Sequence, residues 1–339
     1  MDNKAFQITL EDYKANHLAK QLLEEVYKKK WFRLFLPKDI GGSQLSLHEG
    51  INILRDSARI FGSLGWVINL GAGAGYFYAF YNAETARELF QPREAVIAGS
   101  GSLGGTAVKV NNGYILNGIW SKCSGSEHAT LFTVNATGEN DEVLSFTLTA
   151  DQVQFTNDCQ MFGLKATSSQ SIVVKDALVP DNYVFKIGSV KYFSDYKLYN
   201  LSFDQFARFC MGSTFIGITY CFLDSVEKDI ATKGPQLIST IDELQNELKV
   251  FDQKIIELAK VYWNKANESS SVLIMETDEL ACLIEASCRR IFLKVCQVYY
   301  NGGSRLSNES ELAHWAFRDV LTASQHFLLK GSSLYRNNQ

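Results

Sequence analysis

Apolar residues in the first part of the chain recur at the spacing of amphipathic helices. Thr9 and Asp12 indicate a capped helix start, and the apolar positions that follow this spacing are Leu10, Tyr13, His17, Leu18 and Leu22. Pro37 and the pair Gly41-Gly42 then interrupt the pattern, and a second helix carries Ile51, Ile53, Leu54, Ala58 and Ile60. We therefore expect mainly helices from residue 8 to about residue 95.

The segment from Gly62 to Phe80 is apolar and rich in glycine. Gly65, Gly71 and Gly73 leave positions without side chains in a segment that is otherwise typical of a helix. Such a helix can approach another backbone or a ligand closely. An ordinary buried core helix gives the same pattern, so the sequence leaves both interpretations open.

Residues 96 to about 186 change to short runs of β-forming residues separated by turns. Asn112-Gly113 and the segment Gly138 to Asp141 are turn signals. The β runs are 96–99, 107–110, 130–134, 143–148, 153–155 and 171–174. Short strands at this spacing predict a small barrel or two packed sheets.

Helical spacing returns from about residue 200. Short connections join four long segments, which predicts an antiparallel four-helix bundle from 203–230, 239–266, 278–300 and 310–329. The predicted fold class is therefore mainly α with a central β domain. Its expected domains are an N-terminal helical domain (1–95), a middle β-barrel or sandwich (96–190) and a C-terminal four-helix bundle (191–339).

Composition and charge narrow the function classes. The chain has 339 residues, of which 46% are hydrophobic and 21% charged, and its net charge is −4 at pH 7. These values are ordinary for a soluble protein and argue against a nucleic-acid surface. We find no apolar run of about 18 residues for a membrane helix, and the first residues lack the apolar core of a secretory signal. The seven cysteines form no Cys-x-x-Cys pair, which argues against metal binding and favours reduced thiols in the cytoplasm.

The stretch from Asn112 to Ala129 carries the densest candidate chemistry. A strand that includes Trp120 leads into Ser124, Gly125 and Ser126, which place hydroxyls and backbone N–H groups on one tight segment. Such a segment can hydrogen-bond a flat heteroaromatic ring or an anion. A Ser-Gly-Ser segment is more often a plain loop, and a Trp is more often core, so this stretch needs support from elsewhere in the chain.

That support comes from further motifs and from the order of the elements. The motifs are Pro37 with Gly41-Gly42, Gly163-Leu164-Lys165-Ala166-Thr167-Ser168-Ser169, Gly302-Gly303 and Arg318-Asp319. On these residues the chain resembles the acyl-CoA dehydrogenase superfamily over nearly its whole length. The resemblance implies the same three domains in the same order.

One chemistry of this superfamily is acyl-CoA dehydrogenation with FAD. The resemblance implies a carboxylate base, commonly a Glu shortly after the Arg-Asp pair. Here Phe327 stands at that position, and no carboxylate follows Asp319. Without a carboxylate in reach, abstraction of the α-proton lacks its base. Candidate substitutes on other helices are Glu227, Glu243 and Glu285.

The other chemistry is that of two-component flavin monooxygenases, such as the oxygenase component of 4-hydroxyphenylacetate hydroxylase. Their pattern is similar to Gly118-Ile119-Trp120 with Ser124-Gly125 and His128-Ala129, and to Arg318-Asp319 with His326. The resemblance implies that Ser124 and His326 lie near the flavin and act in catalysis. An imidazole, with an ordinary pKa of about 6.5, can polarise or deprotonate a substrate. A half-buried structural role is the alternative for His326, and we expect His128 to be structural.

The resemblance also implies a wider set of flavin contacts. The expected cofactor-binding residues are Trp120, Ser124, Gly125, Ser126, Lys165, Thr167, Ser169, Arg208, Gly302 and Gly303. Lys165 replaces the family's usual Arg and lacks its bidentate geometry, and Arg208 has a surface ion pair as its alternative role. Residues 157–160 lack the usual aromatic, and residues 231–236 lack the Arg-x-x-Phe-Gly loop that helps to hold the FAD diphosphate. These departures favour FMN over FAD.

Three hypotheses for function follow. The first is an oxygenase component that takes reduced FMN, or FAD, from a separate reductase and oxidises a small aromatic or heteroaromatic substrate. The run Gly99 to Gly104 precedes no helix, so we expect no nicotinamide site of the chain's own. The second is an FAD-dependent acyl-CoA dehydrogenase-like enzyme, and the third a non-catalytic member of the fold. The resemblance implies a homotetramer or dimer, and we expect no nucleic-acid or membrane partner.

Overall fold

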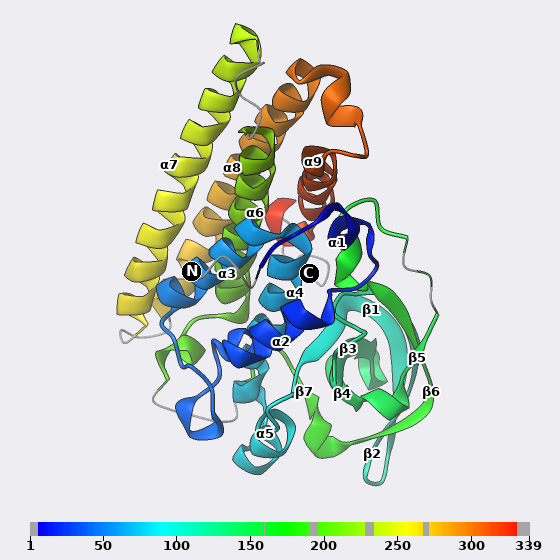
Figure 1. Ribbon diagram of the computed structural model, residues 1–339. Coiled ribbons are helices and arrows are strands. Elements are labelled where there is room, and N and C mark those ends of the chain that lie inside the picture. The colour runs from blue at the N-terminus through cyan, green and yellow to red at the C-terminus, as the bar shows by residue number, and fades with distance from the viewer. Residues whose placement is uncertain are drawn as a thin grey trace.

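The computed structural model describes residues 6–156, 158, 160–189, 196–227, 234–266 and 271–330, with only the backbone for 271–278. Helices precede and follow a block of strands along the chain, and Figure 1 shows the long helices side by side with the sheet below and beside them. The predicted fold class, mainly helical with a β part between the helices, is confirmed at this level. The division into three domains stays a prediction.

The helices before the sheet are α1 (Leu10–Lys14), α2 (Lys20–Lys28), α3 (Leu47–Ile60), α4 (Gly62–Gly73) and α5 (Ala83–Phe90). Thr9 and Asp12 form the predicted cap as a reciprocal capping box. The predicted helix through Leu22 is wrong in one respect, because Ala15 is extended and splits it into α1 and α2. The break lets both Tyr13 and Leu18 reach the core.

The glycine-rich segment is helical as α4 and continues as a 3₁₀ helix, η3 (Ala74–Phe80). A Cβ built on Gly65 would lie 2.2 Å from Ala58 Cα, so this glycine lets α4 cross α3 at close range. Gly73 has nothing within 4 Å of its Cβ position. Gly65 therefore fits the close approach to another backbone, whereas Gly73 lies beside open space and lines a cavity.

The strands are β1 (Ile97–Val110), β2 (Gly113–Cys123), β3 (Leu131–Thr137), β4 (Val143–Thr149), β5 (Gln154–Phe155), β6 (Gln170–Pro180) and β7 (Val184–Phe185). They form one sheet in the order β5-β6-β2-β1-β3-β4-β7, in which only β1 and β3 run parallel. The alternative of two packed sheets is wrong. The single sheet curves around its own core, which includes Trp120, Phe132 and Phe146, and Phe132 on β3 meets Phe155 on β5 with ring centres 5.8 Å apart.

The helices after the sheet are α6 (Phe203–Glu227), α7 (Pro235–Lys265), α8 (Ser271–Asn301) and α9 (Leu312–Ala323), followed by a 3₁₀ helix, η11 (Phe327–Lys330). α6 is long and apolar enough to cross a membrane by length and composition, contrary to our expectation from the sequence. However, 89% of its apolar window is buried inside the protein, as in a core helix. It packs in one hydrophobic core with residues from α3 and α4.

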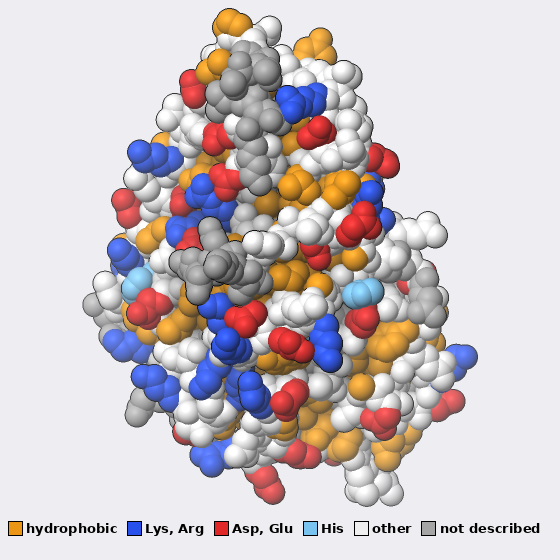
Figure 2. Space-filling view, in the orientation of Figure 1, with side chains coloured by type: hydrophobic (Ala, Val, Ile, Leu, Met, Phe, Trp, Pro, Cys, Tyr) orange, Lys and Arg blue, Asp and Glu red, His pale blue; other side chains and the backbone are white. Residues whose placement is uncertain are grey.

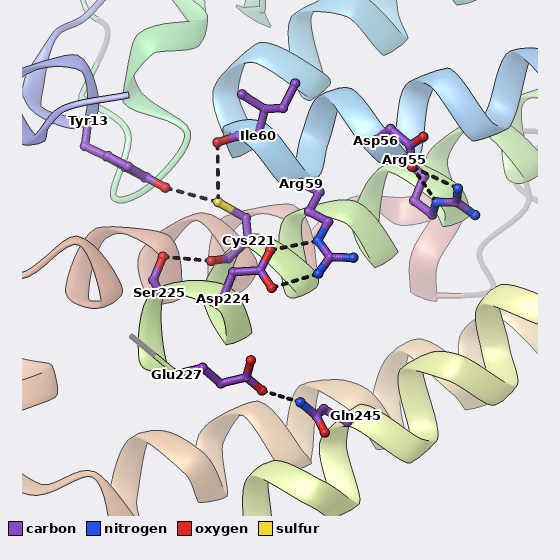
Figure 3. A network of polar contacts seen from close by, with 10 residues as sticks. All are labelled: Tyr13, Arg55, Asp56, Arg59, Ile60, Cys221, Asp224, Ser225, Glu227 and Gln245. Atoms are coloured by element: carbon purple, nitrogen blue, oxygen red, sulfur yellow. Dashed lines mark hydrogen bonds and ion pairs between the residues drawn. The ribbon is translucent and has the colours of Figure 1, made fainter. Parts of the chain in front are cut away.

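Polar contacts hold the first helices against the later ones (Figure 3). Arg59 on α3 makes two hydrogen bonds, of 2.7 and 2.9 Å, to the carboxylate of Asp224 on α6. The Tyr13 hydroxyl lies 3.2 Å from Cys221 Sγ in the buried space between α1 and α6. Since an exposed ion pair adds little stability, the shared apolar core supplies most of the stability of this contact between helices.

On the face shown in Figure 2, charged side chains of both signs are intermingled.

Candidate functional site

A cavity of about 190 Å³ lies between the sheet and the helices. The helical side is contributed by α4, η3, α6 and η11, and the sheet side by β1, β3, β4 and β7. Its walls are mainly apolar, and the aromatic lining residues are Phe77, Phe185, Phe203, Phe206 and Phe327. A mainly apolar site with a few polar groups is typical of small-molecule binding.

On the sheet side, β1 leaves its regular pairing with β3 at the cavity. The register shifts between Ser100 and Leu103, so Gly101 and Ser102 have no partner residue in the β1–β3 ladder. Such bulges free backbone groups and are common beside active sites. Behind the bulge, the Asn135 amide donates to the Gly101 carbonyl at 3.1 Å and accepts from the Ser145 hydroxyl at 2.7 Å, which fixes this wall.

His326 lies on the opposite wall, in the turn between α9 and η11. Its Nδ1 accepts a hydrogen bond from the Leu328 backbone N–H at 3.4 Å, and its ring meets the edge of Trp66 with centroids 5.6 Å apart. Desolvation by burial lowers the pKa of His326 to about 4, so the ring is neutral at pH 7. Because Nδ1 acts as the acceptor, the proton of the neutral ring lies on Nε2, which makes His326 a hydrogen-bond donor.

Asn69 is the second polar group on the helical wall. It lies one helical turn after Trp66 on α4, and its amide nitrogen donates to Met211 Sδ at 3.6 Å. Its Oδ1 atom has no hydrogen-bond partner among the residues that the structure describes. An acceptor on Asn69 and a donor on His326 thus belong to the same cavity.

The described residues that line the cavity include no Asp, Glu, Lys or Arg. Phe327 lines it at the position where a dehydrogenase would carry its Glu. The candidate substitutes lie elsewhere: Glu227 accepts a hydrogen bond from Gln245, Glu243 pairs with Lys294, and Glu285 is exposed on α8. Figure 3 shows Glu227 at the end of α6, directed toward α7.

A network of hydroxyl groups joins the two sequence motifs of the β part. Ser169 Oγ lies 2.6 Å from Ser124 Oγ and 2.7 Å from Thr167 Oγ1. Two further bonds link the segments, from Gly125 N–H to the Thr167 carbonyl at 2.7 Å and from Ser126 Oγ to the Ser168 carbonyl at 2.6 Å. The motifs therefore form one unit, although Ser124 is not among the residues that line the cavity.

The Arg-Asp pair of α9 holds the start of the second motif. Asp319 Oδ1 accepts from the Leu164 N–H at 2.6 Å, and Arg318 Nε donates to the Phe162 carbonyl at 2.6 Å. Thr322 Oγ1 accepts from the Gly163 N–H at 2.9 Å. Burial raises the pKa of Asp319 to about 7, against the opposing effect of the Leu164 hydrogen bond.

With this geometry established, known proteins can be compared with the chain. No protein-family model matches it. Over 155 residues the chain is 28% identical to the flavin-dependent monooxygenase oxygenase subunit HsaA of Mycobacterium tuberculosis, a match that covers 44% of this chain and 39% of that protein. It is 24% identical to an indole-3-acetate monooxygenase of Pseudomonas putida over 342 residues, 95% of this chain and 86% of that protein. The alignments to the first relatives cover 39% to 56% of their lengths.

Among solved structures, XiaF from Streptomyces sp. in complex with FADH2 and glycerol matches 96% of this chain and 89% of its own, with a TM-score of 0.86 and 18% identity. The chain has the acyl-CoA dehydrogenase-like fold. Its relatives and structural neighbours include oxygenase components of flavin-dependent monooxygenases, which confirms the resemblance inferred from the sequence motifs.

Most of the residues expected near the flavin lie in three places. His326 is the one that lines the cavity. Ser124, Gly125, Ser126, Thr167 and Ser169 form the hydroxyl network and are not part of the cavity lining. Gly302 and Gly303 lie at the end of α8, where Gly302 lines a separate cavity of about 160 Å³ with Asn301 and Arg305.

The remaining expected residues have partners within the protein. Trp120 is fully buried inside the curved sheet, and its Nε1 donates to the Asn135 carbonyl at 2.8 Å. Lys165 Nζ lies over the Trp315 ring, 5.6 Å from its centre. Arg208 is buried and donates to Asp204 at 2.7 Å and to the Leu328 carbonyl at 3.1 Å. Asn157, Cys159 and residues 231–233, which entered the choice between FMN and FAD or the cysteine count, lie outside the described residues.

Sequence reasoning missed Asn69 and the bulge at Gly101. Asn69 stands in an otherwise apolar helix, and a buried polar residue in such a helix is a usable signal. The glycines of Gly99-Ser100-Gly101 form no nicotinamide fingerprint, but glycines within a strand also mark a strand irregularity. His128, expected to be structural, stacks on Phe32 with ring centres 5.4 Å apart and does not line the cavity.

Proposed function

We propose that the chain is the oxygenase component of a two-component monooxygenase, which uses reduced flavin and O2 to oxidise a small aromatic or heteroaromatic substrate. The observation that carries this proposal is the aromatic cavity, which has His326 on its wall and Phe327 where a dehydrogenase would hold its base. The names of the relatives support it.

Flavin fits the chemistry of the cavity's sheet side. The irregular backbone of β1 at Gly101 would hydrogen-bond the polar edge of a flavin ring, and Thr133 and the apolar wall would lie against its face. When bound, reduced flavin supplies two electrons, so that one oxygen atom of O2 enters the product and the other leaves as water. The departures from the FAD-binding pattern favour FMN, while the FADH2 complex of XiaF makes FAD the necessary comparison.

The side chains supply orientation and exclusion of water. The Nε2–H of His326 donates a hydrogen bond to the substrate oxygen or nitrogen and polarises it. The aromatic side chains exclude water from the reacting centre, which limits unproductive loss of reducing equivalents. Asp319 acts indirectly, because it holds the turn that carries Thr167 and Ser169, whose network positions Ser124.

Ser124 remains our candidate for a flavin contact from the β part. Its hydroxyl lies 2.6 Å from Ser169 Oγ. To contact flavin, the Ser124 hydroxyl would have to keep this hydrogen bond and form a second one, or replace it. The roles of Arg208 and Lys165 toward a flavin phosphate, and of Gly302 and Gly303 toward the rest of the cofactor, are proposals of the same kind.

A dehydrogenase role has less support. Abstraction of an α-proton needs a base within hydrogen-bond reach, and the described lining offers neutral His326 but no carboxylate. A non-catalytic role is the third candidate. In the proposed role a separate reductase delivers reduced flavin, the assembly is a homotetramer or dimer, and the protein works in the cytoplasm.

One stopped-flow experiment separates these functions. The full chain is mixed with anaerobically reduced FMN, or reduced FAD, and then with oxygen, while absorbance is followed. A long-lived species distinct from oxidised flavin supports the oxygenase, and flavin oxidation at the protein-free rate contradicts it. Reduction of a dye by acyl-CoA supports the dehydrogenase, and absence of flavin binding in either redox state supports the non-catalytic role.

A further inference from the structure

The polar groups of the cavity divide into those already paired and those still available. Asn135 and Ser145 are bonded to one another, and Ser100 Oγ lies 2.8 Å from Ser102 Oγ. On the helical wall, Asn69 Oδ1 and His326 Nε2 have no hydrogen-bond partner among the described residues. The first is an acceptor and the second a donor, which matches a group that both donates and accepts, such as a hydroxyl.

The charge of the cavity is equally informative. Its described lining contains no Lys, Arg, Asp or Glu. Desolvation keeps the pKa of His326 at about 4, so its imidazole provides no positive charge near pH 7. A carboxylate that entered this space would lose its hydration without gaining a cation, which strongly disfavours its binding.

We propose that the cavity selects uncharged hydroxylated aromatic molecules, whose hydroxyl donates to Asn69 and accepts from His326, and that it rejects aromatic acids. This inference rests on the proposed function and names the substrate class of the same site. It separates the chain from the relative in Pseudomonas putida, whose name gives indole-3-acetate, an anion at neutral pH, as its substrate. The aromatic walls supply the apolar contact area for the ring.

The decisive test compares two ligands of nearly equal shape. 4-Hydroxyphenylacetamide and 4-hydroxyphenylacetate differ by one charge, and their binding to the full chain is measured by calorimetry at pH 7. Titrations are done anaerobically with reduced FMN present and repeated without flavin. We expect the amide to bind at least about tenfold more tightly than the acid. Equal or tighter binding of the acid, or no binding of the amide in either titration, overturns the proposal.

Two variants assign the preference to this cavity. Asn69→Leu should abolish the preference for 4-hydroxyphenylacetamide over phenylacetamide, which lacks the hydroxyl, while the preference for amide over acid remains. Leu70→Arg adds a cation to the same wall and should raise binding of the acid at least about tenfold, whereas Leu70→Met should not. If Leu70→Arg does not fold, the wild-type comparison of amide and acid still decides.

Measurements of ligand binding and of hydroxylation distinguish a failure of the proposed ligand class from a failure of the proposed function. If the amide binds with the expected preference but yields no hydroxylated product with reduced flavin and oxygen, the proposed function fails and the ligand class stands. If the acid is hydroxylated as efficiently as the amide, the proposed function stands and the ligand class is wrong.

Discussion

Asp319 Oδ1 accepts a hydrogen bond from the backbone N–H of Leu164 at 2.6 Å, and this bond joins the last long helix to the β part of the chain. The carboxylate also lies against the start of α4, since a Cβ on Gly62 would stand 2.6 Å from Asp319 Oδ2. From Leu164 the contacts continue through its carbonyl to Thr167 Oγ1 at 2.7 Å and then to Ser169. Asp319 of the Arg-Asp motif is thus connected by hydrogen bonds to Thr167 and Ser169 of the β part.

The first prediction concerns the two oxygens of Asp319. Asp319→Ala should destabilise the fold by about 1–3 kcal/mol, because the buried Leu164 N–H loses its acceptor. At pH 4.5, Asp319→Asn keeps an acceptor and should fold with stability close to that of the wild type. Urea denaturation curves of the two variants check this difference, and an equal loss in both would contradict it.

The same side chain predicts a pH dependence. The folded-state pKa of Asp319, about 7, is above its unfolded value of about 3.8, so its contribution to stability is present below pH 4. That contribution is lost as the pH rises through 7. Relative to Asp319→Asn, the wild type should therefore lose stability between pH 4 and pH 7, a difference that denaturation midpoints at pH 4.5 and pH 7.5 measure directly.

A second prediction tests the close packing of the Leu164 turn on α9. A Cβ at Gly163 would lie 2.1 Å from the Arg318 carbonyl oxygen, so Gly163→Ala forces two backbones apart. We expect a loss of at least about 2 kcal/mol in the free energy of unfolding. Gly73→Ala is the matched control, because its Cβ meets nothing within 4 Å and alanine favours a helix. Similar losses in the two variants would contradict the packing argument.

His326 gives the third prediction. His326→Ala removes the Nε2–H donor and should abolish hydroxylation while the fold and flavin binding are retained. His326→Gln offers a replacement N–H and should retain on the order of a tenth or more of the wild-type hydroxylation activity. Product formation is measured by chromatography, with circular dichroism as the check on folding. If His326→Ala unfolds, the imidazole is structural and the catalytic assignment is wrong.

The spacing of apolar residues and turn signals predicts most of the helices and strands that the structure shows. Spacing and turn signals locate the strands from residue 97 and the helices from residue 203, and helices such as α7 bury one side of a regular repeat. Phe327, which the sequence motif singled out at the position of a dehydrogenase's Glu, lines the cavity. Local sequence therefore predicts elements and residue types well.

Contacts between distant parts of the chain were not predictable in the same way. The pairing of Asp319 with Leu164 joins residues 155 positions apart, and only packing decides which buried N–H a carboxylate meets. Asn69 on α4 lines the same cavity as His326, 257 positions later in the chain, a relationship that no local pattern encodes. The split between α1 and α2 likewise follows from core packing and not from helical spacing, because it lets Tyr13 and Leu18 both be buried.

The fourth prediction concerns the hydroxyl network, in which Ser124 and Ser169 share one hydrogen bond of 2.6 Å. Ser124→Ala and Ser169→Ala should each cost about 1 kcal/mol of stability, because each removes a neutral hydrogen bond. If Ser124 is the group that reaches the flavin, only Ser124→Ala should also weaken binding of reduced FMN, measured by anaerobic fluorescence titration. Equal effects of the two variants on FMN binding would place the serines in a purely structural role.

The last prediction concerns His128. Its Nε2 is buried without a hydrogen-bond partner among the residues that the structure describes, and desolvation lowers its pKa to about 4. Because the folded-state pKa lies below the unfolded value of about 6.5, the unfolded chain binds the proton more readily, and stability falls as the pH drops from 6.5 toward 4. His128→Phe keeps a ring against Phe32 and removes both the titration and the unpaired nitrogen. This variant should be at least as stable as the wild type at pH 7 and lose less stability at pH 5, as thermal melts at the two pH values would measure. A variant that loses as much stability as the wild type on acidification would mean that His128 is not a source of acid sensitivity.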